Sequence, residues 1–95
     1  MECIVEEKTI LEEAIEIVVD RKDGRNYGSF SEGMKRAAMI FNGMTGHEIE
    51  TKDMYAALIA LKLSRESYHH KRDNLVDACG YLQGLHDLHN NIDRG

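Results

Sequence analysis

Two groups of acidic residues are spaced as metal ligands on helices would be. Glu12, Glu13 and Glu16 form the pattern E-E-x-x-E, and Asp73 and Asp77 lie four residues apart later in the chain. On a helix, residues three or four apart share a face, and carboxylates on facing helices can hold Mg²⁺ together with phosphate oxygens. We therefore predict a Mg²⁺ site formed by Glu12, Glu16 and Asp77. For the glutamates a solvated acidic face is the simpler interpretation, because exposed glutamates are common in helices.

Two cations are available to pair with these acids or with phosphate. Lys62 and Arg65 lie three residues apart, which places them on one face of a helix. Burying an unpaired cation is costly, so we expect both to have partners. In one interpretation the two cations form a structural network with Asp73 and Asp77, which fixes the register of two helices. In the other they bind phosphate. We favour the network and keep the phosphate site as the alternative.

Two tyrosines are candidates to stack on a nucleotide base. Tyr27 precedes Gly28 in a loop, and loops carry binding residues disproportionately, although its ring could instead anchor the loop on the core. Tyr81 lies between Gly80 and Gly84 on the last predicted helix. Glycine inside a helix costs about 1 kcal/mol relative to alanine, so two glycines indicate close approach by another backbone or by a ligand.

Other catalytic and metal-binding patterns are missing from the sequence. Four of the five histidines lie in the last third of the chain, but no cysteine at zinc-binding spacing accompanies them. Cys3 and Cys79 are too few for a disulfide framework, which favours a reducing compartment. The sequence contains no P-loop, no G-x-G-x-x-G and no G-x-S-x-G motif.

The elements that must position these residues are helices. Apolar residues recur at helical spacing in four segments. In the second segment, the apolar stripe from Phe30 to Met44 is expected to face the core. The third is apolar around most of its surface between Met54 and Leu63, which is typical of a helix inside a bundle or at a subunit interface. The expected N-terminal caps are Thr9 with Glu12, Ser29 with Glu32, Thr51, and Asp73 or Asn74, and the second helix is expected to end at Asn42–Gly43 or Thr45–Gly46.

Four helices with short connections indicate an all-α fold, an antiparallel four-helix bundle-like domain with the third helix at its centre. We expect one helical domain over residues 9–90, after a flexible leader at residues 1–8 and before a frayed tail at residues 91–95. The strongly apolar third helix leads us to expect a homo-oligomer.

Composition narrows the class of protein. The 95 residues are 42% apolar and 31% charged, with a net charge of −5, as in an ordinary globular domain. Without a basic cluster, the chain is not expected to bind nucleic acid. No segment has the roughly 18 apolar residues of a membrane span, and the acidic N-terminus does not have the pattern of a signal peptide. We expect no membrane association and a location in the cytoplasm.

The motifs together resemble those of small phage and prophage proteins of unknown function, over residues 10–88. The residues that carry this resemblance are Arg25, Tyr27-Gly28, Phe30, Phe41, Lys62-Leu63-Ser64-Arg65 and Asp73…Asp77-x-x-Gly80-Tyr81. More distantly, the order of elements is similar to that of the MazG-like all-α nucleoside triphosphate pyrophosphohydrolases. Those proteins carry E-E-x-x-E on one helix and E-x-x-D on a later one. Here Asn74-x-x-Asp77 has an amide in place of the first acid, and the two pieces lie further apart.

The resemblance implies a phage-type accessory protein that handles a nucleotide or another phosphorylated ligand and assembles as an oligomer. A phage-encoded protein of this kind is expected in the cytoplasm of the host cell. In the enzymatic form of this hypothesis, Glu12, Glu16 and Asp77 hold Mg²⁺, Lys62 and Arg65 neutralise phosphate charge, and Tyr27 or Tyr81 stacks on the base. The alternative is a non-catalytic oligomeric module that blocks a host protein or sequesters a nucleotide.

Overall fold

The computed structural model describes residues 7–19 and 30–92. Within these two ranges it contains four α-helices and no β-strand. The helices are α1 (Ile10–Val19), α2 (Phe30–Thr45), α3 (Thr51–Tyr68) and α4 (Arg72–His89). The prediction of an all-α chain with four helices is therefore confirmed. Tyr27, Ser29, most of the expected leader and the last three residues of the expected tail lie outside the described residues.

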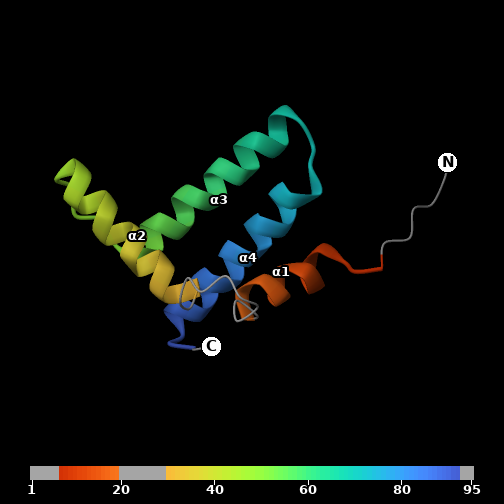
Figure 1. The fold of residues 1–95 in the computed structure, drawn as a ribbon, viewed down its shortest axis with the longest axis horizontal. Helices are drawn as coiled ribbons and strands as arrows, with labels where there is room; N and C mark the ends of the chain where they lie inside the picture. Colours follow the sequence, from red (N-terminus) through yellow and green to blue (C-terminus); the bar gives the residue numbers. More distant parts are fainter. Residues whose placement is uncertain (1–6, 20–29, 93–95) are drawn as a thin grey trace.

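The helix at the centre of the fold is α4 rather than the predicted third helix. α3 and α4 form an antiparallel hairpin, and α1 also packs along α4, running in the same direction as α4 (Figure 1). α2 crosses the beginning of α3 and also contacts α4. Among the described helices, α4 packs most extensively: it lies along both α3 and α1 and also contacts α2.

Small residues explain why α4 takes the central position. Gly80 faces α1, and a Cβ atom added there would lie 3.6 Å from Cγ2 of Val18. Gly84 faces α2 and α3, and a Cβ atom added there would lie 2.7 Å from Cε1 of Phe30 and 2.6 Å from Cε1 of Tyr55. The close approach expected at the two glycines is therefore made by neighbouring helices. In contrast, three alanines of α3 are exposed: Ala56, Ala57 and Ala60.

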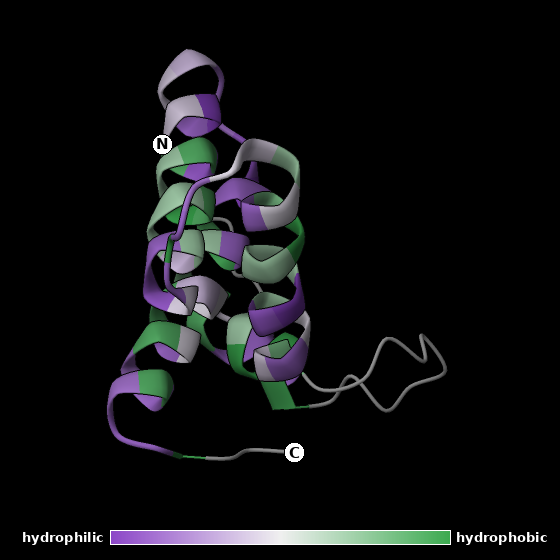
Figure 2. Cartoon of the chain, turned by 90° about the vertical axis from the view of Figure 1, so that its left-hand side faces the viewer, coloured by the Kyte–Doolittle hydropathy of each residue, from purple (hydrophilic) through white to green (hydrophobic). Residues whose placement is uncertain are grey.

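The hydrophobic core lies where α1 ends and α2 begins. Val18, Phe30, Met34 and Tyr55 are buried together there, one or two from each of α1, α2 and α3, and leucines of α3 and α4 pack around them. The expected apolar stripe of α2 is buried only in its first half, because the second half extends past α3 and leaves Met44 exposed. Figure 2, turned by 90° from Figure 1, shows hydrophobic and hydrophilic residues alternating along the helices.

Local capping explains where the helices begin and end. The Thr9 N–H donates to Oε1 of Glu12 (3.1 Å) and the Glu12 N–H donates to Oγ1 of Thr9 (3.2 Å), which confirms the capping box of α1. α2 ends at the second of its two predicted positions, followed by Gly46 with a φ of +76°. That left-handed conformation favours glycine.

The two later helices begin slightly before their predicted caps. The N-cap of α3 is Glu50 rather than Thr51, and the Glu50 N–H donates to Oδ2 of Asp53 (2.8 Å). The N-cap of α4 is Lys71, ahead of both predicted residues. In each case an acidic side chain satisfies a backbone N–H that the helix leaves without a partner.

Candidate functional site

An ion pair joins the middle of α3 to the first half of α4. Nζ of Lys62 lies 2.8 Å from Oδ2 of Asp77, and the two side chains are only 18% and 31% exposed. Such partial burial weakens solvent screening, so this pair contributes more than an exposed one would. Of the four residues considered for a network, these two are in contact.

The other two residues of that set lie apart from the pair. Arg65 and Asp73 have exposed side chains, and neither joins an ion pair within the described residues. The reason is helical geometry: residue 66, four positions after Lys62, lies closer to the same line along α3 than Arg65 does. Glu66 therefore faces α4, and Arg65 is left exposed one turn from Lys62.

Glu66 is a site residue that the sequence analysis missed. Its carboxylate accepts hydrogen bonds from the Lys71 N–H (3.1 Å) and from Nδ2 of the buried Asn74 (3.5 Å), and it pairs with Nδ1 of His70. Burial raises the pKa of the Glu66 carboxyl, but these hydrogen bonds outweigh burial, so the pKa lies below its ordinary value. The sequence did contain a signal for this role: Lys62 and Glu66 lie four residues apart and therefore share one face of the helix.

Lys62, Glu66, Asn74 and Asp77 together form what we term the α3–α4 polar cluster. It consists of two cross-helix contacts, Lys62 with Asp77 and Glu66 with Asn74, at the end of the hairpin away from the hydrophobic core. Asn74 occupies the position of the first acid of the E-x-x-D pattern. Here it donates to a carboxylate, a contact that an ionised acid could not make without repulsion.

The glutamates of α1 have separate partners. Glu12 forms the capping box described above. Glu16 pairs with Nζ of Lys8 (2.8 Å). Glu13 accepts from Nε of Arg72 (3.1 Å), and Nη2 of Arg72 also donates to the carbonyl oxygen of Lys8 (2.9 Å). The acid of E-E-x-x-E that contacts α4 is therefore Glu13, and it contacts a cation.

The residues proposed as Mg²⁺ ligands do not assemble within one chain. α1 and α3 are separate neighbours of α4, and Asp77 pairs with Lys62 of α3, whereas Glu12 and Glu16 of α1 have partners of their own. Across residues 7–19 and 30–92, no group of three or more His, Cys, Asp or Glu side chains is placed to hold a metal ion. Glu12, Glu16 and Asp77 thus do not fit a Mg²⁺ site in a single copy of the chain.

Of the two candidate tyrosines, the structure describes Tyr81. Tyr81 stacks on Phe30, with ring centroids 5.8 Å apart and an interplanar angle of 26°, so one face of its ring is covered within the core. Tyr27 lies outside the described residues.

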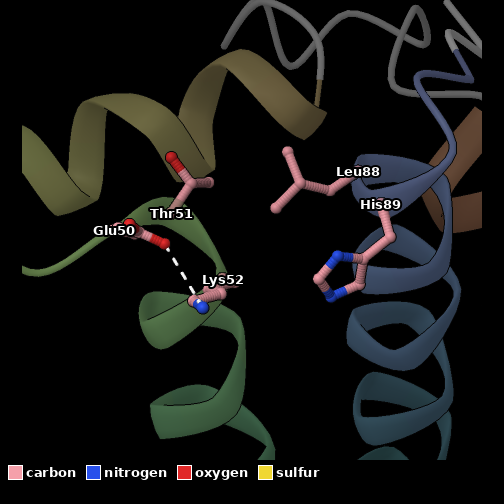
Figure 3. Close-up of a pocket in the computed structure, with 5 residues that line it drawn as sticks. All are labelled: Glu50, Thr51, Lys52, Leu88 and His89. Carbon is pink, nitrogen blue, oxygen red and sulfur yellow. Dashed lines mark ion pairs between the residues drawn. The ribbon is translucent and has the colours of Figure 1, made fainter.

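A shallow hollow lies at the opposite end of the hairpin from the polar cluster. It has a volume of about 270 Å³ and is lined by Glu50, Thr51, Lys52, Leu88 and His89. Figure 3 shows these residues on the beginning of α3 and the end of α4, with the ion pair between Glu50 and Lys52 (3.4 Å) at one side. Lys52 and Lys62 are separated by ten residues of α3, or about 15 Å, so the hollow is separate from the α3–α4 polar cluster.

Comparison with known proteins places the chain in a family. Residues 9–89 match the family described as a Domain of unknown function (DUF6378). The chain belongs to this family. It is also 34% identical, over 77 residues, to the Gene 55 protein of Mycobacterium phage D29; this match covers 78% of the chain and 49% of that protein, so the chain spans about half the length of its phage relative. No solved structure matches.

The DUF6378 match begins at the residue that caps α1 and ends at the last residue of α4. The family unit is therefore the four-helix domain, and the α3–α4 polar cluster lies inside it. The phage relative supports the phage-type family of unknown function that the sequence motifs indicated. Among the described helices, none is both long and apolar enough to span a membrane.

Proposed function

We propose that this DUF6378 domain is a phage accessory protein of the host cytoplasm that binds a nucleotide or another phosphorylated small ligand at Lys62 and Arg65. The supporting observation is that Lys62 is held by Asp77 at 2.8 Å while Arg65, one turn on, is exposed. Asp77 positions the ammonium group, and Arg65 offers a guanidinium that can donate two hydrogen bonds to a phosphate. Because Asp77 offsets the charge of Lys62, the three side chains carry one net positive charge, and the exposed Arg65 guanidinium is the group that would meet the phosphate.

The geometry supports binding better than hydrolysis in a single chain. The pyrophosphohydrolase-like form needs carboxylates that gather on Mg²⁺, and Glu12, Glu16 and Asp77 have other partners. Magnesium accordingly enters this proposal as the counter-ion of the nucleotide. Tyr27 and Tyr81 remain candidates for base stacking, Tyr81 through the ring face that Phe30 does not cover.

The test is thermal denaturation of the full chain with a panel of ribonucleoside and deoxyribonucleoside triphosphates, with and without Mg²⁺. A ligand that binds the folded state raises the melting temperature by mass action. Arg65→Ala should abolish the shift, and Lys52→Ala, an exposed lysine of the same helix, should leave it intact. Pyrophosphate release, assayed on the same samples, tests the enzymatic form separately. If no nucleotide raises the melting temperature, or if Arg65→Ala responds as the wild type does, the ligand site is wrong.

A second candidate function is a non-catalytic homo-oligomeric module that blocks a host protein. The observation in its favour is the exposure of large apolar side chains on α2, since Met39 is 72% and Met44 is 82% exposed. Exposed apolar patches of this kind often mark protein interaction sites. This candidate predicts an oligomer whose melting temperature no nucleotide changes.

A further inference from the structure

The outward side of α2 combines apolar and basic residues. Met39, Ile40 and Met44 are exposed, and Lys35 and Arg36 precede the first two of them by one helical turn. Neither cation has an ion-pair partner within the described residues. We call these five residues the outer α2 surface. It is an apolar ridge next to two cations that pair with no acidic side chain in residues 7–19 and 30–92.

The outward side of α1 has the same layout with the opposite charge. Leu11, Ile15 and Val19 are exposed at steps of four, and Leu11 is 66% exposed. Glu12 and Glu16 form a parallel row beside them, also exposed. We call these five residues the outer α1 surface. Because residues at i and i+4 line up on a helix, the surface is an apolar ridge flanked by an acidic one.

The two surfaces carry opposite charges, and each has an apolar ridge that the other could cover. α1 contains three glutamates and no cation, whereas α2 contains Lys35 and Arg36 against the single acid Glu32. We propose that the outer α1 surface of one copy packs on the outer α2 surface of a second copy, and that the second copy returns the same contact about a two-fold axis. This inference rests on the proposed homo-oligomer and is independent of the proposed ligand.

A second copy is the occupant because one chain carries both halves of the contact. In a two-fold dimer, a contact between the outer α1 surface of the first copy and the outer α2 surface of the second is repeated with the two copies exchanged. The area buried by one helix on another is therefore doubled, which brings it toward the roughly 800 Å² per partner of a stable interface. The apolar ridges supply the buried area. The opposite charges favour a contact between α1 of one copy and α2 of the other over a contact between the two α2 helices.

Glu12 and Glu16 have partners within their own chain but can still contact cations of a second copy. Glu16 pairs with Lys8, but its side chain stays 49% exposed, so a second cation can reach it. Glu12 is engaged in the capping box through one carboxylate oxygen and is also exposed. Because Glu12 stabilises the start of α1, Glu16 is the better residue for a charge reversal.

The test is the molar mass of the full chain, measured by sedimentation velocity over a range of concentrations. The wild type is expected to form a dimer. The double variant K35E/R36E, and separately E16K, should raise the dissociation constant at least about tenfold, because like charges would then meet. Combining E16K with K35E/R36E restores opposite charges and should recover most of the affinity. Met39→Ser should weaken the dimer, and Leu63→Ser, a matched control at an exposed leucine of α3, should not.

Four results would overturn the inference: a wild type that stays monomeric, a dimer that is indifferent to the charge reversals, a combined variant that fails to recover, or growth beyond a dimer into open chains. Circular dichroism of each variant establishes that a lost dimer is still folded. Measuring nucleotide-induced melting shifts on K35E/R36E separates the two proposals. A shift that persists in the monomeric variant leaves the ligand site standing, and a lost ligand response in intact dimers would count against the ligand site alone.

Discussion

Gly84 of α4 lies against the ring of Tyr55 of α3 so closely that no side chain fits between them. A Cβ atom at Gly84 would be 2.6 Å from Cε1 of Tyr55, below any van der Waals contact, and Tyr55 is only 1% exposed and has nowhere to move. This contact sets the distance between the two helices of the hairpin at its core end. The packing of α3 on α4 therefore depends on a glycine that costs helix stability on its own.

Gly84→Ala is expected to destabilise the fold by about 1–3 kcal/mol, because one extra methyl group overpacks a filled core. Gly33→Ala is the matched control: a Cβ atom there meets nothing within 4 Å. That substitution should stabilise by up to about 1 kcal/mol through helix propensity. Urea denaturation of both variants measures the difference. Equal effects of the two substitutions would contradict the tight packing at Gly84.

Replacing either member of the Lys62–Asp77 pair should destabilise the fold by about 1–2 kcal/mol, between the values for exposed and buried pairs. The side chains are less than one-third exposed, so the remaining charge is left partly desolvated. The double-mutant cycle of Lys62→Ala and Asp77→Ala, followed by urea denaturation, should give a coupling free energy of about 1 kcal/mol. The exposed pair Glu50–Lys52 is the control and should show almost none.

Local chemistry made the four helices and several of their ends predictable, because apolar periodicity and caps such as Thr9 with Glu12 act within a few residues. The central position of α4 was not predictable in the same way. Gly80 and Gly84 indicated that something approaches closely, but only the tertiary arrangement determines that α1, α2 and α3 do so.

The candidate site was predictable in outline and not in its pairing. Helical spacing placed Lys62 and Arg65 on one side of α3, yet a cross-helix contact depends on the rotation and register of α4, which the spacing does not contain. Asp77 and Asn74 meet α3, and Asp73 lies exposed. Glu66 was missed because two of its partners, His70 and Lys71, lie in the α3–α4 turn and the third, Asn74, lies in the first turn of α4. The path of the chain through that turn cannot be predicted from the residue types alone.

Glu66 should make the fold sensitive to acid. Its pKa is lower in the folded chain than its ordinary value of 4.5, because the hydrogen bonds of the α3–α4 turn outweigh burial. The unfolded chain therefore takes up the proton first, and the stability that Glu66 contributes is present above the ordinary pKa and is lost as pH falls through the folded pKa. In Glu66→Gln, the free energy of unfolding should fall less between about pH 5 and pH 3 than in the wild type. Urea denaturation at several pH values measures this, and parallel curves for the two proteins would argue against the assignment.

Tyr55 should make the fold sensitive to alkali, with the opposite sign. Burial, and then the negative charge of Asp87, raise the pKa of the Tyr55 hydroxyl above its ordinary value of 10.0. The folded chain therefore keeps the proton after the unfolded chain has lost it, so stability is full below pH 10 and declines as pH rises toward the folded pKa. Ultraviolet titration of tyrosinate should show one group that ionises only with unfolding. Tyr55→Phe should remove that group and reduce the loss of stability at alkaline pH, whereas Tyr68→Phe, at an almost fully exposed ring, should leave the alkaline unfolding unchanged.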